Sequence, residues 1–305
     1  MNNSFSTPEE ILETTIAKGV KKVNTSIYSQ LILGFLAGSF IAFAAAGSTM
    51  ASFNLISSSA TYGLGKVLSG CVFSVGLMLV LLAGGELFTG NNLIITSVFD
   101  KKVRLSRMLC NWFFVYIGNL AGALFIALLM HYSGLFSSGG GLLGGVTIDL
   151  AYKKVSQPFL PLFLMGIMCN WLVCLAVWVS YGAKDAAGKI LAIFFVICLF
   201  ITLGYEHSVA NMYYIPAGLL AKTNESWLAM SSVSASNTET LNIVNFLLKN
   251  LLPVTLGNIV GGAGLVGGLY YISYNKKFEK DNTVDLEREI SDNKCLPIEQ
   301  EVARQ

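Results

Sequence analysis

Two matching stretches decide the fold of this chain: Gly84-Gly85-Glu86-Leu87-Phe88-Thr89-Gly90-Asn91 and Gly204-Tyr205-Glu206-His207-Ser208-Val209-Ala210-Asn211. Both fit the pattern G-x-E-x-x-x-x-N, and they are spaced 120 residues apart. Each copy places a carboxylate inside an apolar run long enough to cross a bilayer. Polar groups are costly in hydrocarbon, and here they interrupt matching segments in two halves of one chain. The pair therefore predicts a transport site at the interface between two repeats.

The composition is that of an integral membrane protein. The 305 residues are 54% hydrophobic and 12% charged, a charged fraction about half that of typical soluble domains. Long uncharged runs predict spans of roughly 20 residues or more; they lie between Lys22 and Lys66, Lys66 and Glu86, Arg107 and Asp149, and Lys249 and Lys276. The net charge of +2 gives no indication of a nucleic-acid partner.

Three regions follow from the charge and hydropathy pattern. Thr7-Pro8-Glu9-Glu10 is a capping box with proline at the first helical position. It opens an amphipathic helix that we expect on the membrane surface. The last thirty residues carry fourteen charges, which predicts a disordered tail. The predicted regions are a cytoplasmic helix at 1–27, a transmembrane channel domain at 28–275 and a charged cytoplasmic tail at 276–305.

Six spans are predicted, at about 28–50, 65–99, 107–133, 158–181, 188–221 and 246–274. The second and fifth are too long for one simple crossing, and each is interrupted in mid-course by one copy of the opening motif. A second repeated pattern, N-x6-G-N-[LI]-x-G, begins at Asn111 and again at Asn250. Three spans per half must insert in opposite directions. The predicted fold class is therefore all-α, with six transmembrane helices in an inverted 3+3 repeat and broken helices two and five.

Lysine and arginine in the loops predict the orientation. They cluster before the first span and after the second, fourth and sixth, as in Lys101, Lys102, Arg104 and Arg107. Both termini are thus expected in the cytoplasm, in a multi-pass protein of the inner or plasma membrane. The first residues are acidic and polar, so no secretory signal is expected.

The polar residues at the two breaks are candidates for a structural role. A helix broken at membrane depth exposes N–H groups that hydrocarbon cannot satisfy. Glu86 and Glu206 can accept hydrogen bonds from such groups. We therefore predict that Glu86, Glu206, Asn91 and Asn211 brace the breaks, with Glu206 also orienting His207.

His207 is the histidine that falls within a predicted span, since His131 lies at the outer end of the third span. Its ring can switch between donor and acceptor, and its charge is tunable near neutral pH. We predict a role in a pore, with Thr89 and Asn258 supplying further polar contacts. Asn119, the repeat mate of Asn258, is equally explained by helix packing. No C-x-x-C or His/Cys cluster occurs, so we expect no metal and no cofactor.

Apolar side chains around the breaks are consistent with two interpretations. They either form ordinary core or close a path as an apolar constriction that excludes water; these residues are Phe73, Leu77, Leu87, Phe88 and Phe200. Composition does not separate the two.

Four segments in order resemble the formate/nitrite transporter family over roughly residues 8–275. They are Gly85–Asn91, Cys169–Trp178, Gly204–Met212 and Asn250–Asn258. The resemblance implies an aquaporin-like fold and a homopentamer in which each protomer has its own pore. It also implies that Thr89, His207 and Asn258 form the central polar group with Glu206 beside the histidine.

The same resemblance implies two constrictions and a vestibule. The constrictions would be formed by Leu77, Leu87, Phe88 and Phe200. Lys154 is similar to the family's vestibule lysine and Asn170 to its neighbour, although the adjacent Lys153 leaves that assignment open by one position.

Family substrates are small monovalent anions of weak acids, and protons are expected partners. Formate is the first choice because Leu87-Phe88-Thr89 fits formate-type members, but nitrite and hydrosulfide members can share these residues, and lactate is a further candidate. A different class, an aquaporin-like channel for neutral solutes, lacks support because no Asn-Pro-Ala motif occurs. An enzyme is not expected, since no H-E-x-x-H, G-x-S-x-G or intramembrane Asp pair is found.

Overall fold

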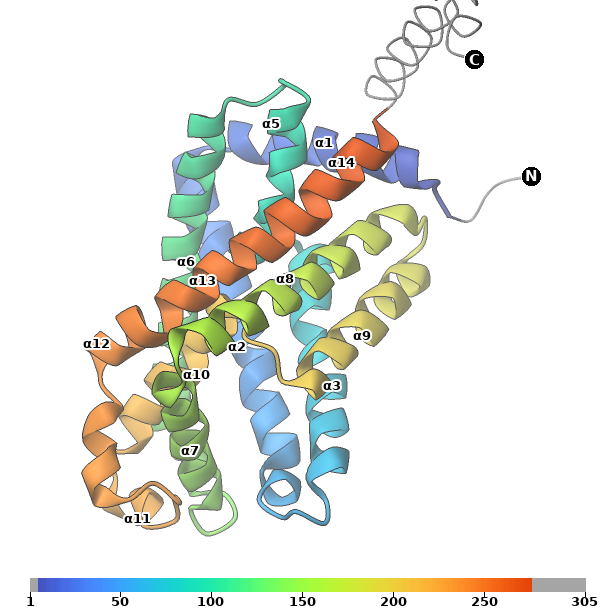
Figure 1. Ribbon diagram of the computed structural model, residues 1–305. Helices are drawn as coiled ribbons and strands as arrows, with labels where there is room; N and C mark the ends of the chain where they lie inside the picture. Colours follow the sequence, from blue (N-terminus) through green and yellow to red (C-terminus); the bar gives the residue numbers. More distant parts are fainter. Residues whose placement is uncertain (1–4, 276–305) are drawn as a thin grey trace, which may run out of the picture.

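The computed structural model describes residues 5–275, and over that range it is helical with no strand (Figure 1). The tail predicted at 276–305 lies outside the described residues. Six helical segments are long and apolar enough to cross a membrane: Ile27–Ile56, Tyr62–Gly84, Leu105–Tyr132, Phe159–Gly182, Ala186–Leu203 and Ile243–Tyr274. The prediction of six apolar helices is confirmed.

The first half of the chain contains six α-helices and two short helices of other types. The α-helices are α1 (Pro8–Asn24), α2 (Ile27–Ile56), α3 (Tyr62–Met78), α4 (Phe88–Asn91), α5 (Ile95–Phe99) and α6 (Leu105–Tyr132). The π-helix η1 (Leu79–Gly84) continues α3, and the 3₁₀ turn η2 (Asn92–Ile94) joins α4 to α5.

The second half follows a similar order. Its α-helices are α7 (Leu142–Ser156), α8 (Phe159–Gly182), α9 (Ala186–Leu203), α10 (Ser208–Ala221), α11 (Glu225–Leu228), α12 (Ile243–Asn245), α13 (Leu252–Ile259) and α14 (Leu269–Tyr274). The remaining helical turns are η3 (Leu135–Ser137), η4 (Ala235–Thr240), η5 (Phe246–Leu251) and η6 (Val260–Gly268).

In the second and fifth spans, the apolar helix ends at the motif copy that the sequence predicts will interrupt it. The apolar helices end at Gly84 and Leu203, whereas the predicted spans ran to about residues 99 and 221. Gly84 and Gly204 have φ angles of +96° and +80°, a left-handed conformation that ends a helix and that glycine adopts without strain. The chain is non-helical at 85–87 and 204–207, and helix resumes at Phe88 and Ser208. That each pair of segments forms one interrupted crossing, within an inverted repeat, stays a prediction.

Helix α1 has the predicted capping box: the Thr7 hydroxyl accepts from the Glu10 N–H, and the Glu10 carboxylate accepts from the Thr7 N–H. Its apolar face, which the sequence assigned to the membrane surface, is instead buried against the protein. This face forms a cluster with Trp178 of α8 and Tyr271 of α14. Helices α1 and α14 therefore lie together at one end of the molecule (Figure 1).

Two glycines mark the closest helix crossings. A Cβ placed on Gly122 of α6 would overlap the carbonyl oxygen of Phe35 on α2, and one placed on Gly261 would overlap the carbonyl oxygen of Ile167 on α8. Both glycines close the repeated N-x6-G-N pattern. The pattern thus brings the third and sixth spans into direct backbone contact with the first and fourth.

Candidate functional site

Thr89 and His207 meet in the interior, although 118 residues separate them. The Thr89 Oγ1 atom lies 2.9 Å from His207 Nε2, and both side chains are buried. Thr89 belongs to the first turn of α4, and His207 is the N-cap residue of α10. Each motif copy thus places one polar side chain, at or just after its non-helical segment, at a shared point.

The hydrogen-bond pattern assigns the tautomer of His207. Its Nδ1 atom accepts a hydrogen bond from the Ala210 backbone N–H at 3.0 Å, as an N-cap does. With Nδ1 as acceptor, the neutral ring carries its proton on Nε2 and donates it to Thr89 Oγ1. The hydroxyl hydrogen of Thr89 is then available to another acceptor.

Asn258 and Asn119 hold the two non-helical segments in the same way. The Asn258 amide donates to the carbonyl oxygen of Glu206 at 3.0 Å and accepts from the Ser208 N–H at 2.9 Å. The Asn119 amide donates to the carbonyl oxygen of Glu86 at 2.8 Å and accepts from a backbone N–H of α4 at 2.9 Å. Buried peptide groups need a hydrogen-bond partner when neither water nor a helical partner is within reach. Both asparagines supply that partner at the points where a helix ends and the next one begins.

The Glu206 carboxylate is held by a lysine and an asparagine. Lys154 Nζ donates to both carboxylate oxygens, at 2.9 and 3.1 Å, and Asn211 Nδ2 donates at 2.6 Å. Asn211 also donates to Asn250 Oδ1 at 2.8 Å, and Asn250 in turn donates to the Lys154 carbonyl oxygen at 2.9 Å. The side chains form a closed ring of contacts.

The Glu86 carboxylate sits in an equivalent ring. Lys22 Nζ and Asn91 Nδ2 donate to it at 2.8 and 2.7 Å. Asn91 also donates to Asn111 Oδ1 at 2.9 Å, and the Asn111 amide lies 3.5 Å from the Lys22 carbonyl oxygen. The repeat seen in the sequence is therefore also a repeat of contacts.

Sequence reasoning missed the roles of Lys22, Asn111 and Asn250 in these rings. The two asparagines were visible as the first residue of the N-x6-G-N pattern, but the pattern gave them no partner. Lys22 on α1 occupies the position that Lys154 occupies on α7. Comparing the segment before the first span with the segment before the fourth would have revealed this match.

The apolar residues predicted at the constrictions are all buried: Phe73, Leu77, Leu87, Phe88 and Phe200. Phe200 packs edge-on against Phe73, with ring centroids 5.8 Å apart, and lies 6.1 Å from the His207 ring. Phe88 instead packs edge-on against Trp112 and Tyr116 of α6. The structure thus brings Phe200 next to His207, with Phe73 behind Phe200, and it packs Phe88 against the neighbouring helix.

Asn170 lies at the central site, away from the vestibule where the resemblance placed it. It is completely buried on α8, and its amide donates to the carbonyl oxygens of Asn258 and Thr89 at 2.7 and 3.2 Å. It also donates to Asn92 Oδ1 at 2.8 Å. Asn170 therefore fixes the backbone of Thr89.

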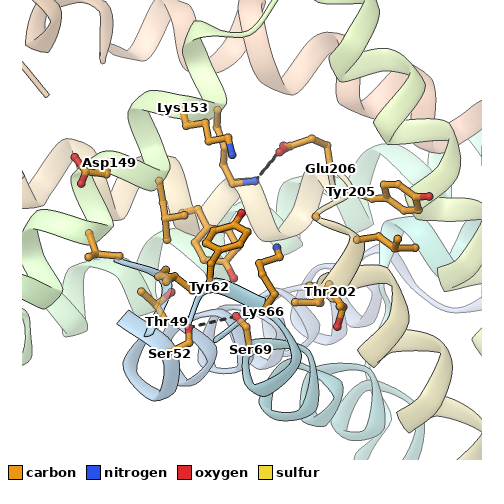
Figure 2. A pocket seen from close by; sticks show the side chains of 18 of the residues that line it. Thr49, Ser52, Tyr62, Lys66, Ser69, Asp149, Lys153, Thr202, Tyr205 and Glu206 are labelled. Atoms are coloured by element: carbon orange, nitrogen blue, oxygen red, sulfur yellow. Dashed lines mark hydrogen bonds and ion pairs between the residues drawn. The ribbon is translucent and has the colours of Figure 1, made fainter. Parts of the chain in front are cut away.

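A cavity of about 640 Å³ is lined by Glu206, the residue that precedes His207 (Figure 2). Lys154, Glu206 and Tyr205 line it together with residues of α2, α3 and α9. Of the two adjacent lysines, Lys154 pairs with Glu206, while Lys153 is exposed. The Lys154–Glu206 pair thus forms part of a cavity wall.

Comparisons with known proteins agree with these features. The formate/nitrite transporter family model matches residues 9–272. The uncharacterized transporter YrhG of Bacillus subtilis is 40% identical over 276 residues, covering 90% of this chain and 96% of that protein. The formate channel BtFdhC of Bacillus thuringiensis is 37% identical over 275 residues, covering 90% of this chain and 98% of that protein.

Two solved structures share the fold. A pentameric formate channel with formate bound has a TM-score of 0.73 at 36% identity, covering 81% of this chain and 97% of that chain. An FNT family ion channel has a TM-score of 0.72 at 25% identity, covering 87% of this chain and 98% of that chain. These relatives are channels and transporters, not enzymes, and six apolar helices make this chain a multi-pass membrane protein. By sequence and by fold, the chain belongs to the formate/nitrite transporter family.

Proposed function

We propose that this protein is a channel for small monovalent anions of weak acids, with formate as its main substrate. One observation carries the proposal: the buried Thr89–His207 contact joins the two motif copies, and each copy holds its carboxylate in an equivalent Lys–Glu–Asn contact ring. Such an arrangement gives a polar point of passage inside an otherwise apolar wall. We choose formate over other small anions because similar proteins are named formate channels.

The proposed architecture follows from the repeat. Helices α3 and α4, and likewise α9 and α10, form broken crossings in an inverted repeat, as the matching contacts of Asn119 and Asn258 support. We assign the protein to a homopentamer in which each protomer has its own path, by similarity to the pentameric formate channel. Both termini face the cytoplasm, and the protein resides in the inner or plasma membrane.

The free energy of moving the substrate favours passage as the neutral acid. A bare anion in a dry apolar passage costs several kcal/mol. Protonating an acid of pKa about 4 at pH 7 costs roughly 4 kcal/mol, because each unit is about 1.36 kcal/mol. Phe200 lies beside His207 and packs against Phe73, so the two rings form an apolar wall at this point. The anion therefore takes up a proton before it passes these rings.

The geometry of His207 argues that this proton comes from water. The neutral ring holds its single proton on Nε2, and giving it up would leave an imidazolate. A charged ring would need a second proton on Nδ1, which would break the hydrogen bond from the Ala210 N–H. We therefore assign His207 and Thr89 to hydrogen bonding with the passing substrate, and the proton to the solvent at the mouth.

Uptake by proteoliposomes tests the substrate. Formate, nitrite, hydrosulfide and lactate are compared over a range of external pH, with protein-free vesicles as the control. We expect formate uptake to exceed that of the other three and to rise as the pH falls. Osmotic swelling in a neutral solute, without anion uptake, would overturn the proposal in favour of an aquaporin-like channel.

A further inference from the structure

The cavity beside Glu206 is lined by three lysines and two carboxylates: Lys66, Lys153, Lys154, Asp149 and Glu206. Hydroxyl groups of Ser52, Ser69 and Thr202 contribute to the same wall. The hydroxyls of Ser52 and Thr202 already donate to backbone carbonyl oxygens. The formal charge of the lining is thus +1, and its lysine ammonium groups are the donors suited to a small anion. Which of the three lysines faces such an anion depends on which charges are already paired.

Lys154 is not the free charge. Its ammonium contacts both oxygens of Glu206, and it also lies 5.2 Å from the Tyr214 ring centroid. Asp149 is likewise occupied, since its Oδ1 accepts from the Ser231 hydroxyl and the Ser232 N–H at 2.6 and 2.9 Å. The Lys154 charge is therefore balanced before any substrate arrives.

Lys66 is different. Within residues 5–275, no ion pair joins it to a carboxylate, and its side chain is half-buried. In Figure 2 the side chain reaches from α3 into the cavity, toward the side where Glu206 lies. A Cβ placed on Gly204 would lie 3.3 Å from Lys66 Nζ, so the ammonium rests against the turn that leads to Glu206 and His207.

An unpaired cation that is half withdrawn from water costs free energy unless a counter-charge joins it. Gly204 favours this position because it has no side chain, which leaves room for the ammonium to approach the backbone. Lys153 also has no ion pair in the described part of the chain, but it is exposed and its charge is hydrated. Among the described residues that line the cavity, Lys66 is thus the cation poised for an anion.

We propose that Lys66 is the anion-receiving residue of this cavity, where it binds a small monovalent anion before the anion reaches the Thr89–His207 site. In this arrangement Lys154 positions Glu206, and Lys66 attracts the substrate. The inference rests on the proposed function, because the captured anion is the transported one.

The test is the concentration dependence of formate uptake by proteoliposomes. Lys66→Met is expected to raise the half-saturating formate concentration about three- to tenfold, because one nearby positive charge is lost. Uptake at saturating formate is expected to be retained. Lys66→Arg is expected to behave like the wild type. Lys249→Met is the control, since Lys249 is exposed and does not line this cavity. Ionic strength should slow uptake less in Lys66→Met than in the wild type.

An unchanged half-saturating concentration and unchanged salt dependence in Lys66→Met would overturn the assignment, and Lys66 would then be a lysine that merely extends to water. If Lys66→Met does not assemble, Lys66→Gln replaces it, and the same two readouts decide. A wild type that takes up none of formate, nitrite, hydrosulfide and lactate would remove the proposed function and this inference together. Uptake by the wild type with no Lys66 effect removes the inference alone.

Discussion

Each of the two buried carboxylates, Glu86 and Glu206, is neutralised by one lysine from outside its own motif. The sequence pattern identified both carboxylates and predicted that they accept from backbone N–H groups at the breaks, but the structure shows them accepting from lysine and asparagine side chains. The pattern did not identify the lysines, because a contact across 64 residues between Lys22 and Glu86 leaves no local spacing to detect. The motif itself therefore carried no trace of these charge pairs, which become visible when the segments before the first and fourth spans are compared or when the fold is known.

Breaking one of these pairs should destabilise the protein strongly. Lys154→Met removes the counter-charge of Glu206, and losing one partner of a buried pair costs about 3–5 kcal/mol. The side chain of Lys154 is 14% exposed, whereas that of Lys102, which pairs with Asp100, is 60% exposed. Lys102→Met is therefore the matched control, with an expected cost of about 1 kcal/mol or less.

The measurement is the unfolding free energy in detergent, by denaturant titration followed by circular dichroism. Equal losses in the two variants would contradict a buried, structural Lys154–Glu206 pair. A double variant, Lys154→Met with Glu206→Met, should recover part of the loss, because it leaves no unpaired charge at this site.

At the scale of helices, hydropathy gave all six apolar segments close to their true starts, and it gave the ends of the third, fourth and sixth to within a residue, but it carried the second and fifth past their ends. Helices α3–η1 and α9 stop at left-handed glycines inside apolar runs, and hydropathy does not register a change of φ. The contact of α1 with α8 and α14 was also missed. An amphipathic face looks the same in sequence whether it covers lipid or protein.

The helix crossings give an element-scale prediction. Gly261→Ala is expected to destabilise the protein by about 1–3 kcal/mol, because the new methyl group meets the carbonyl oxygen of Ile167 on α8. Gly264, three residues further along η6, has no neighbouring atom within 4 Å of a placed Cβ in the described part of the chain. Gly264→Ala should thus be neutral or slightly stabilising in the same unfolding measurement. A neutral Gly261→Ala would show that α8 and the sixth span separate without cost.

For the whole molecule, the sequence predicted the family, the six apolar helices and the meeting of two motif copies. The structure adds how the copies differ. Both copies place a carboxylate in a ring of contacts with one lysine and two asparagines, but one copy contributes Thr89 and the other His207 to the shared contact. The residues that match between the two copies hold the non-helical segments in place. The residues that differ, Thr89 and His207, face each other in the interior. The central claim is that a weak acid passes this contact while His207 stays neutral.

The most direct test compares formate uptake by proteoliposomes of the wild type and of His207→Asn across external pH. Asparagine keeps a hydrogen-bond donor, but its side chain does not take up a proton to become a cation. We predict that His207→Asn slows uptake at every pH and leaves the shape of the pH dependence unchanged, since the proton comes from water. Uptake equal to the wild type throughout would place the passage elsewhere. Loss of the pH dependence would show that His207 itself supplies the proton and would contradict the account.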